Sequence, residues 1–153
     1  MNELSRLYNP AKQIAAMRSR FPQFSAKRKA ESVVFTGELM VKPDLPIYTV
    51  NVEYRMYGSP IVRVLKPELV SPCKHLYKDK VTGERSLCLY HPANFHWRND
   101  RLVAKEIMEW TIAWIYFYEY WLQTWEWVGP EVPHEGSKSM IGNEVKENVK
   151  CKK

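Results

Sequence analysis

The stretch from Asp100 to about Trp127 most constrains the fold, because its large apolar side chains recur at alternating intervals of four and three residues. This spacing places them on one face of a helix. The positions that carry the pattern are Val103, Ile107, Trp110, Trp114, Phe117 and Trp121. Three further residues, Ile112, Ile115 and Leu122, widen the apolar arc. A helix with so broad an apolar face must be covered by other structure, so we expect it to pack against a sheet.

Three strand patterns precede this helix, near residues 32–41, 47–57 and 60–65. The second alternates between apolar and polar positions, and its apolar side consists of Tyr48, Val50, Val52 and Tyr54. Short turns at residues 43–46 and 58–60 contain proline or glycine and connect the three segments. The pattern predicts an antiparallel meander with one wetter face.

An N-terminal helix is expected over residues 10–21, where Asn9 can cap the first turn and Pro10 suits the first helical position. Its apolar stripe comprises Ile14, Met17 and Phe21. The element order is helix, antiparallel meander, irregular cysteine-bearing segment and long aromatic helix, which predicts an α+β domain. We expect a single domain over residues 1–134 and a flexible polar tail over 135–153.

The net charge of +6 is concentrated toward the ends of the chain. Residues 1–30 carry seven lysines and arginines against one acidic residue. We interpret the basic run Lys27, Arg28 and Lys29 as a solvated helix end and linker. A small basic nucleic-acid-binding protein using residues 18–29 is an alternative, but no helix-turn-helix, zinc-finger or RNP pattern accompanies the charge. We therefore do not expect a nucleic-acid partner.

The compartment follows from the cysteines and from the lack of a targeting pattern. Three cysteines, an odd number, do not suit a disulfide-stapled secreted module. Residues 1–7 lack the basic-then-apolar order of a signal peptide. The longest uncharged apolar run, Trp110 to Tyr118, is nine residues long, whereas a membrane-spanning helix needs about 20. We expect a soluble cytoplasmic protein that needs no membrane and no cofactor.

The candidate site lies in the irregular segment at residues 75–97, where Cys88 sits in a short apolar patch. His75, His91 and Asn94 are close in sequence and can donate or accept hydrogen bonds. A cysteine in such surroundings can act as a nucleophile. Alternatively, Cys88 is a small buried hydrophobic residue.

The same segment offers residues for other chemistries. Four soft ligands could bind a zinc ion together, although the spacing of the first two, Cys73 and His75, is unsuitable. These ligands would be Cys73, His75, Cys88 and His91. A cysteine protease fits poorly, because its cysteine normally begins a helix. Cys73 is the rival nucleophile, and Cys151, in the expected tail, is the weakest candidate. We expect no metal.

The order of these parts resembles the ubiquitin-conjugating enzyme (UBC) fold. His75 corresponds to the histidine of that family's His-Pro-Asn motif, and Gly83 fits the loop before the cysteine. Cys88 and Leu89 are similar to the family's Cys-Leu pair, and Trp97 is similar to the tryptophan that follows. The resemblance implies a UBC-like α+β domain with the cysteine on a loop.

The resemblance covers about residues 10–128 and includes three departures from the pattern, one of which is that His91-Pro92 follows the cysteine instead of preceding it. Leu76 and Tyr77 follow the histidine where the family has Pro-Asn, so the asparagine that stabilises the oxyanion is missing there. The gap between His75 and Cys88, 13 residues, is wider than usual. These features resemble the divergent bacterial members found in cyclic-oligonucleotide antiphage (CBASS) operons, sometimes as stand-alone conjugating domains.

In that subfamily the resemblance implies a carrier role. Cys88 would take the C-terminal carboxyl group of a cGAS/DncV-like nucleotidyltransferase as a thioester and pass it to an amine, with a separate activating enzyme as a possible further partner. Asn94 or His91 is nominated to replace the missing asparagine, with the hydroxyl of Tyr77 or Tyr90 as a weaker candidate. His91 would also accept the proton of the attacking amine, and His75 would brace the loop. An inactive UBC-like adaptor remains the alternative within this fold.

Overall fold

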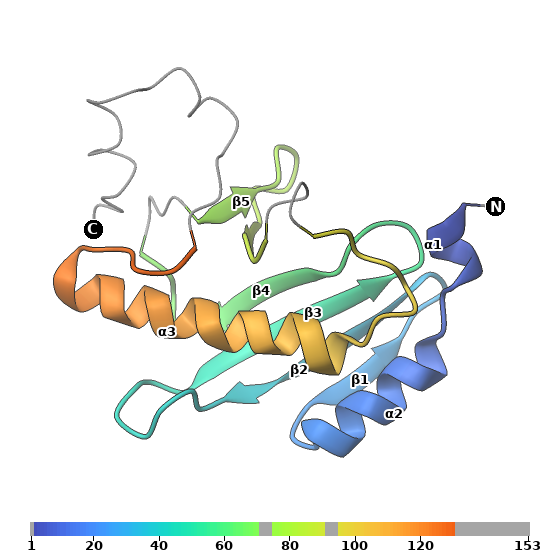
Figure 1. Ribbon diagram of the computed structural model, residues 1–153, viewed down its shortest axis with the longest axis horizontal. Coiled ribbons are helices and arrows are strands. Elements are labelled where there is room, and N and C mark those ends of the chain that lie inside the picture. Colours follow the sequence, from blue (N-terminus) through green and yellow to red (C-terminus); the bar gives the residue numbers. More distant parts are fainter. Residues whose placement is uncertain (1, 71–74, 91–94, 131–153) are drawn as a thin grey trace.

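A computed structural model describes residues 2–70, 75–90 and 95–130 of the chain (Figure 1). Its centre is an antiparallel four-stranded sheet in the order β1-β2-β3-β4. The strands are β1 Ser25–Arg28, β2 Ser32–Leu39, β3 Tyr48–Arg55 and β4 Ile61–Lys66. The predicted α+β class and the meander of β2, β3 and β4 are confirmed.

The strand β3 follows the predicted alternation at every position. Tyr48, Val50, Val52 and Tyr54 are fully buried, whereas the residues between them are half-buried. Neighbouring strands are held in register by pairs such as Phe35 with Val52 and Val52 with Val62. The apolar face of the sheet therefore forms one side of the core.

The basic run Lys27, Arg28 and Lys29 was wrongly interpreted as a linker. Lys27 and Arg28 belong to β1, which pairs with β2 at the outer edge of the sheet. All four residues of β1 are exposed, so no apolar alternation marks the strand in the sequence. Backbone pairing with β2 and a hydrogen bond from the Ser25 hydroxyl to the carbonyl of Thr36 place this segment, and the charged side chains remain in solvent.

Two helices precede the sheet, α1 Glu3–Arg6 and α2 Pro10–Arg20. The predicted cap of α2 is confirmed, because the Asn9 side chain accepts a hydrogen bond from the backbone N–H of Lys12 at 3.1 Å. Met17 is buried as expected, whereas Ile14 and Phe21 are only half-buried. The sequence gives no sign that Gln13 would be fully buried beside Met17.

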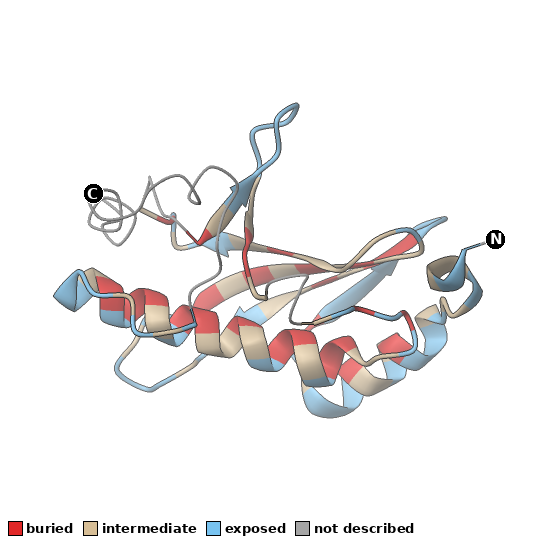
Figure 2. Ribbon diagram, turned by 45° about the horizontal axis from the view of Figure 1, so that its top comes forward, coloured by how far each residue is buried: buried red, intermediate tan, exposed pale blue. Residues whose placement is uncertain are grey.

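The aromatic segment forms a π-helical turn, η1 Val103–Ile107, that continues into α3 Met108–Thr124. This helix lies across one face of the sheet (Figure 1), and buried residues recur along its length (Figure 2). Val103, Ile107, Trp114 and Trp121 are buried as predicted, but Trp110 and Phe117 are only half-buried. The buried arc is turned instead toward Met108, Thr111, Ile115 and Tyr118. A buried threonine is tolerated there because its hydroxyl donates to the carbonyl of Ile107 at 2.7 Å.

The segment predicted as irregular contains a small hairpin, β5 Leu76–Lys78 and β6 Arg85–Leu87. The two strands pair antiparallel as a separate sheet, and β6 packs against β4. Within the described part of the chain, no helix is both long and apolar enough to cross a membrane. The tail expected at residues 135–153 lies outside the described residues.

Candidate functional site

The hairpin of β5 and β6 brings the histidine and the cysteine of the predicted site together. Leu76 pairs with Leu87, and Tyr77 pairs with Ser86. One step further along the ladder, the backbone N–H of Cys88 donates to the carbonyl of His75 at 3.1 Å. Cys88 therefore follows β6 directly and lies opposite His75, although 12 residues separate them in sequence.

The turn of the hairpin is ordered by Asp79. Its carboxylate accepts hydrogen bonds from the backbone N–H groups of Val81 and Thr82, both at 2.8 Å. These bonds lower the pKa of Asp79, because they favour its charged form. Gly83 has a positive φ of 74°, a conformation suited to glycine, and its N–H donates to the carbonyl of Asp79 at 2.9 Å. Gly83 thus closes the turn between β5 and β6.

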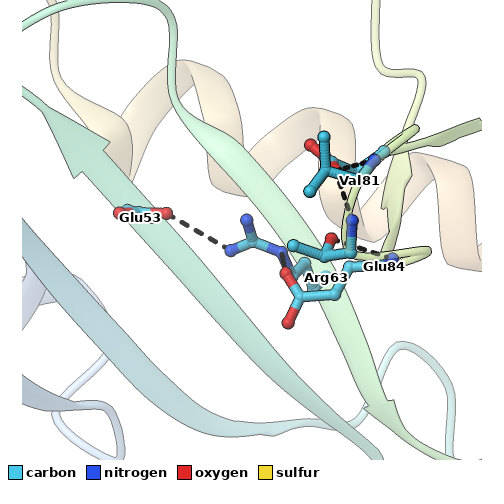
Figure 3. Close-up of polar contacts among 6 residues, drawn as sticks. Glu53, Arg63, Val81 and Glu84 are labelled. Atoms are coloured by element: carbon cyan, nitrogen blue, oxygen red, sulfur yellow. Dashed lines mark hydrogen bonds and ion pairs between the residues drawn. The ribbon is translucent and has the colours of Figure 1, made fainter.

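Arg63 of β4 ties this hairpin to the main sheet (Figure 3). Its Nη1 lies 3.3 Å from Oε1 of Glu53 on β3. Its Nε lies 3.3 Å from Oε2 of Glu84, next to β6. In the next residue along the chain, Arg85 of β6, Nη2 donates to the carbonyl of Leu69 at 3.1 Å. These contacts fix the position of the strand that ends at Cys88.

The Cys88 thiol is covered in this structure, with 5% of the residue exposed. Its Sγ donates a hydrogen bond to the hydroxyl oxygen of Tyr77 at 3.2 Å. Burial raises the pKa of the thiol, whereas the hydrogen bond that the Tyr77 hydroxyl can give to the ionised sulfur lowers it. The pKa lies above its ordinary value, so the thiol is the resting form at neutral pH.

A pocket of about 290 Å³ adjoins the cysteine. Leu87 and Leu89, the two neighbours of Cys88 in sequence, both line it. Tyr77 lines it as well, so the hydroxyl that bonds to the thiol comes from a pocket wall. Pro60, Ile61 and the ring of Tyr90 also line it, beside the polar side chains of Arg55, Ser59 and Ser86. The exposed surface of the pocket is more apolar than polar, which suits an extended chain end better than a highly charged ligand.

The end of β3, the turn after it and the start of β4 also line this pocket, which no sequence pattern indicated. Arg55 and Ile61 both line it, and Nε of Arg55 donates to the carbonyl of Ser59 at 2.8 Å. In the sequence, these residues belong to a strand end and an ordinary turn at Gly58. No pattern distinguishes a turn that faces the cysteine from one that faces solvent.

His75 contacts Cys88 through its backbone and packs its ring elsewhere. The residue is 2% exposed, and its ring stacks on Trp127 at a centroid distance of 4.0 Å. Its carbonyl also accepts a hydrogen bond from Nε1 of Trp114 at 3.1 Å. These contacts fit the bracing role that the resemblance implied for His75.

Tyr90 and Trp97 are held by neighbouring side chains on the same side of the molecule. The ring of Tyr90 contacts Phe95 and Trp110 at centroid distances of 4.9 Å and 5.0 Å. Burial raises the pKa of Tyr90, so its hydroxyl stays protonated at neutral pH. Trp97 is buried, and its Nε1 donates to Asn99 at 2.7 Å.

Several predicted site residues cannot be placed against this geometry. His91, Asn94 and the rival nucleophiles Cys73 and Cys151 lie outside the described residues. Two of the four ligands of the alternative zinc site are among them. In residues 2–70, 75–90 and 95–130, no three or more histidine, cysteine or acidic side chains gather in a way that could hold a metal ion.

A family model described as "Type II CBASS E2 protein" matches residues 13–135. The match spans α2, the sheet, the hairpin with Cys88 and the long helix. No curated protein matches the chain.

Proposed function

The chain belongs to the type II CBASS E2 family, and we propose that it acts as a stand-alone conjugating-type transferase through a thioester on Cys88. The family assigns it a conjugating-type role in CBASS, a bacterial antiphage system. The observation that carries the proposal is the position of Cys88 at the end of β6, between two residues that line the adjoining pocket. A chain end entering this pocket would arrive beside the sulfur.

The first step proposed is acyl transfer to the thiol. The sulfur of Cys88 attacks the carbonyl carbon of an activated acyl donor, either an acyl adenylate or a thioester. The sulfur–carbon bond forms, the bond to the leaving group breaks, and the thiol proton ends on that leaving group. The donor we propose is the C-terminal carboxyl group of a cGAS/DncV-like nucleotidyltransferase, which the UBC resemblance implies, activated by a separate enzyme.

The second step proposed is aminolysis. An amine attacks the thioester carbonyl, an amide bond forms, and the Cys88 thiol is regenerated while the amine loses a proton. We propose that His91 accepts this proton. We further propose that Asn94 makes a supporting contact with the oxyanion. His91→Ala should slow amide formation more than thioester loading. Equal losses in both steps would indicate a structural role for His91 only.

Loading requires a change at the cysteine, because only 5% of the residue is exposed. Tyr77, whose hydroxyl bonds to the thiol, is 45% exposed and lies on the solvent side of β5. A shift of this one ring that keeps its hydroxyl on the sulfur would open the thiol to the pocket without moving the sheet. We propose that binding of the acyl donor accompanies this shift.

The test is co-expression of the chain with its genomic neighbours, followed by reducing and non-reducing gels and mass spectrometry. The wild type should form an adduct that a reducing agent releases, and Cys88→Ala should abolish it. Cys88→Ser should form an oxygen ester that resists the reducing agent. Cys73→Ser and Cys151→Ser are matched controls that should load normally. An adduct that persists on Cys88→Ala would show that another residue carries the acyl group.

A second candidate function is a non-catalytic adaptor with the same fold, and the burial of Cys88 favours it. An adaptor would bind its partner whether or not position 88 holds a thiol. Partner binding that is equal in wild type and Cys88→Ala, without a reducible adduct on the wild type, would identify the adaptor. A reducible adduct on the wild type excludes it.

A further inference from the structure

The hydrogen bond between Cys88 and Tyr77 places a tyrosine hydroxyl on the atom proposed to react. The two atoms are 3.2 Å apart, and they come from the end of β6 and the middle of β5. Tyr77 pairs with Ser86, so the ladder of the hairpin fixes its backbone. Tyr77 also stands two residues after His75, the position where the resemblance places the missing asparagine.

We propose that the Tyr77 hydroxyl is a catalytic hydrogen-bond donor that stabilises the Cys88 thiolate from which acyl transfer begins. This role rests on the proposed function of Cys88. In the resting state the thiol donates to the tyrosine oxygen. Once the thiol has lost its proton, the direction of the hydrogen bond reverses, and the tyrosine O–H donates to the charged sulfur.

Two properties of the site suit this reversal. The thiolate forms in a covered site, where a charge without a hydrogen bond is costly. The tyrosine keeps its own proton, because burial and the bond to Cys88 raise the pKa of Tyr77. The hydroxyl is therefore a donor over the whole range in which a cysteine ionises.

Tyr77 also has the access that the role requires. Its ring lines the 290 Å³ pocket, and 45% of the residue is exposed. The hydroxyl can therefore contact both the sulfur and a group that enters from the pocket. A buried cap on the thiol would instead block the acyl donor.

The test is the pH profile of Cys88 alkylation in the full chain, with iodoacetamide as the probe and the Cys88 peptide followed by mass spectrometry. Tyr77→Phe keeps the ring and removes only the hydroxyl. We expect its profile to move to higher pH, with alkylation slower by about tenfold below the midpoint, as for loss of a hydrogen bond to a charged group. Tyr57→Phe, at an exposed tyrosine outside the site, is the matched control and should keep the wild-type profile.

A second assay separates this role from the proposed function. The probe is the mercaptoethanesulfonate thioester of acetylglycine, and the product is acylated Cys88. We expect wild type to be acylated, with the profile of Tyr77→Phe displaced to higher pH by the same amount as its alkylation profile. A wild type that reacts with iodoacetamide but takes no acyl group would overturn the proposed function. An unchanged alkylation midpoint in Tyr77→Phe would overturn the role of Tyr77, whichever way wild-type acylation turns out.

Discussion

The backbone N–H of Cys88 donates to the carbonyl of His75 at 3.1 Å, so these two residues face each other across one hairpin. The 12 residues between them form β5, a turn ordered by Asp79, and β6. The wide spacing in the sequence is therefore the length of a hairpin. The backbone carbonyl of His75 contacts the cysteine segment, while the ring of His75 packs on Trp127.

The packing of the His75 ring gives the first prediction. His75→Ala removes a buried ring that stacks on Trp127, and we expect the free energy of unfolding to fall by about 2–3 kcal/mol. His75→Phe keeps an aromatic ring and should recover most of this loss in urea unfolding. Acyl transfer to Cys88 should recover with it. A His75→Phe variant that folds stably but transfers no better than His75→Ala would assign a chemical role to the imidazole nitrogens.

A second prediction concerns Gln13, which joins α2 to the start of η1. Its Nε2 donates to the carbonyl of Arg101 at 2.6 Å, and its Oε1 accepts from the N–H of Val103 at 2.9 Å. Gln13→Leu keeps a similar volume but leaves both backbone groups without these bonds. We expect a loss of about 2–4 kcal/mol in the free energy of unfolding, measured in urea.

Gln23 is the matched control for Gln13. Its Nε2 also donates to a backbone carbonyl, that of Glu38 at 3.1 Å, but this contact is exposed to water. Gln23→Leu should therefore change the free energy of unfolding by less than about 1 kcal/mol. Equal effects of the two substitutions would mean that burial of Gln13 does not set its contribution.

Much of the fold was predictable because its signals are local. The Asn9 cap, the alternation of β3 and the aromatic spacing of α3 each appear within one segment of the sequence. The strand β1 was missed because all its residues are exposed and only pairing with β2 places it. The half-burial of Trp110 depends on how the helix is turned about its axis against the sheet, which helical spacing alone does not fix.

The candidate site was only partly predictable. Cys88 and His75 were identified by their resemblance to a known pattern, and Tyr77 was only a weaker candidate. Its contact with the thiol depends on the register of β5 against β6, in which Tyr77 pairs with Ser86. A shift by one residue would turn the tyrosine to the other face of the hairpin. The short strands and long turn carry no periodicity that fixes this register.

The third prediction concerns Arg63, which joins β4 to Glu53 and Glu84. Arg63→Met should loosen the hairpin, because the link to Glu84 is lost. We expect faster hydrogen exchange at the backbone N–H of Cys88. The free energy of unfolding should fall by only about 1 kcal/mol, since Glu84 is largely exposed. Arg98→Met removes a comparable exposed pair with Asp100 outside the hairpin and is the control. Equal exchange at Cys88 in both variants would contradict the anchoring role.

The last prediction is an alkaline limit on stability set by Tyr48. This residue is fully buried, and its hydroxyl donates to the carboxylate of Glu119 on α3. Burial and the bond to Glu119 raise the pKa of Tyr48 above its ordinary value. A tyrosine in the unfolded chain loses its proton near pH 10. Above that pH the unfolded state therefore binds fewer protons than the folded state, and the free energy of unfolding falls as the pH rises.

Urea unfolding between pH 8 and pH 11 measures this effect. The contribution of Tyr48 should be fully present below about pH 10 and decline by roughly 1.4 kcal/mol per pH unit above it. Tyr48→Phe should be less stable than wild type at pH 8, because Glu119 loses its donor, by about 1–3 kcal/mol. Its stability should then fall less steeply above pH 10, so the difference from wild type narrows. Tyr57→Phe, at an exposed position, should follow the wild-type curve; a Tyr48→Phe curve parallel to wild type would show that Tyr48 does not set the alkaline slope.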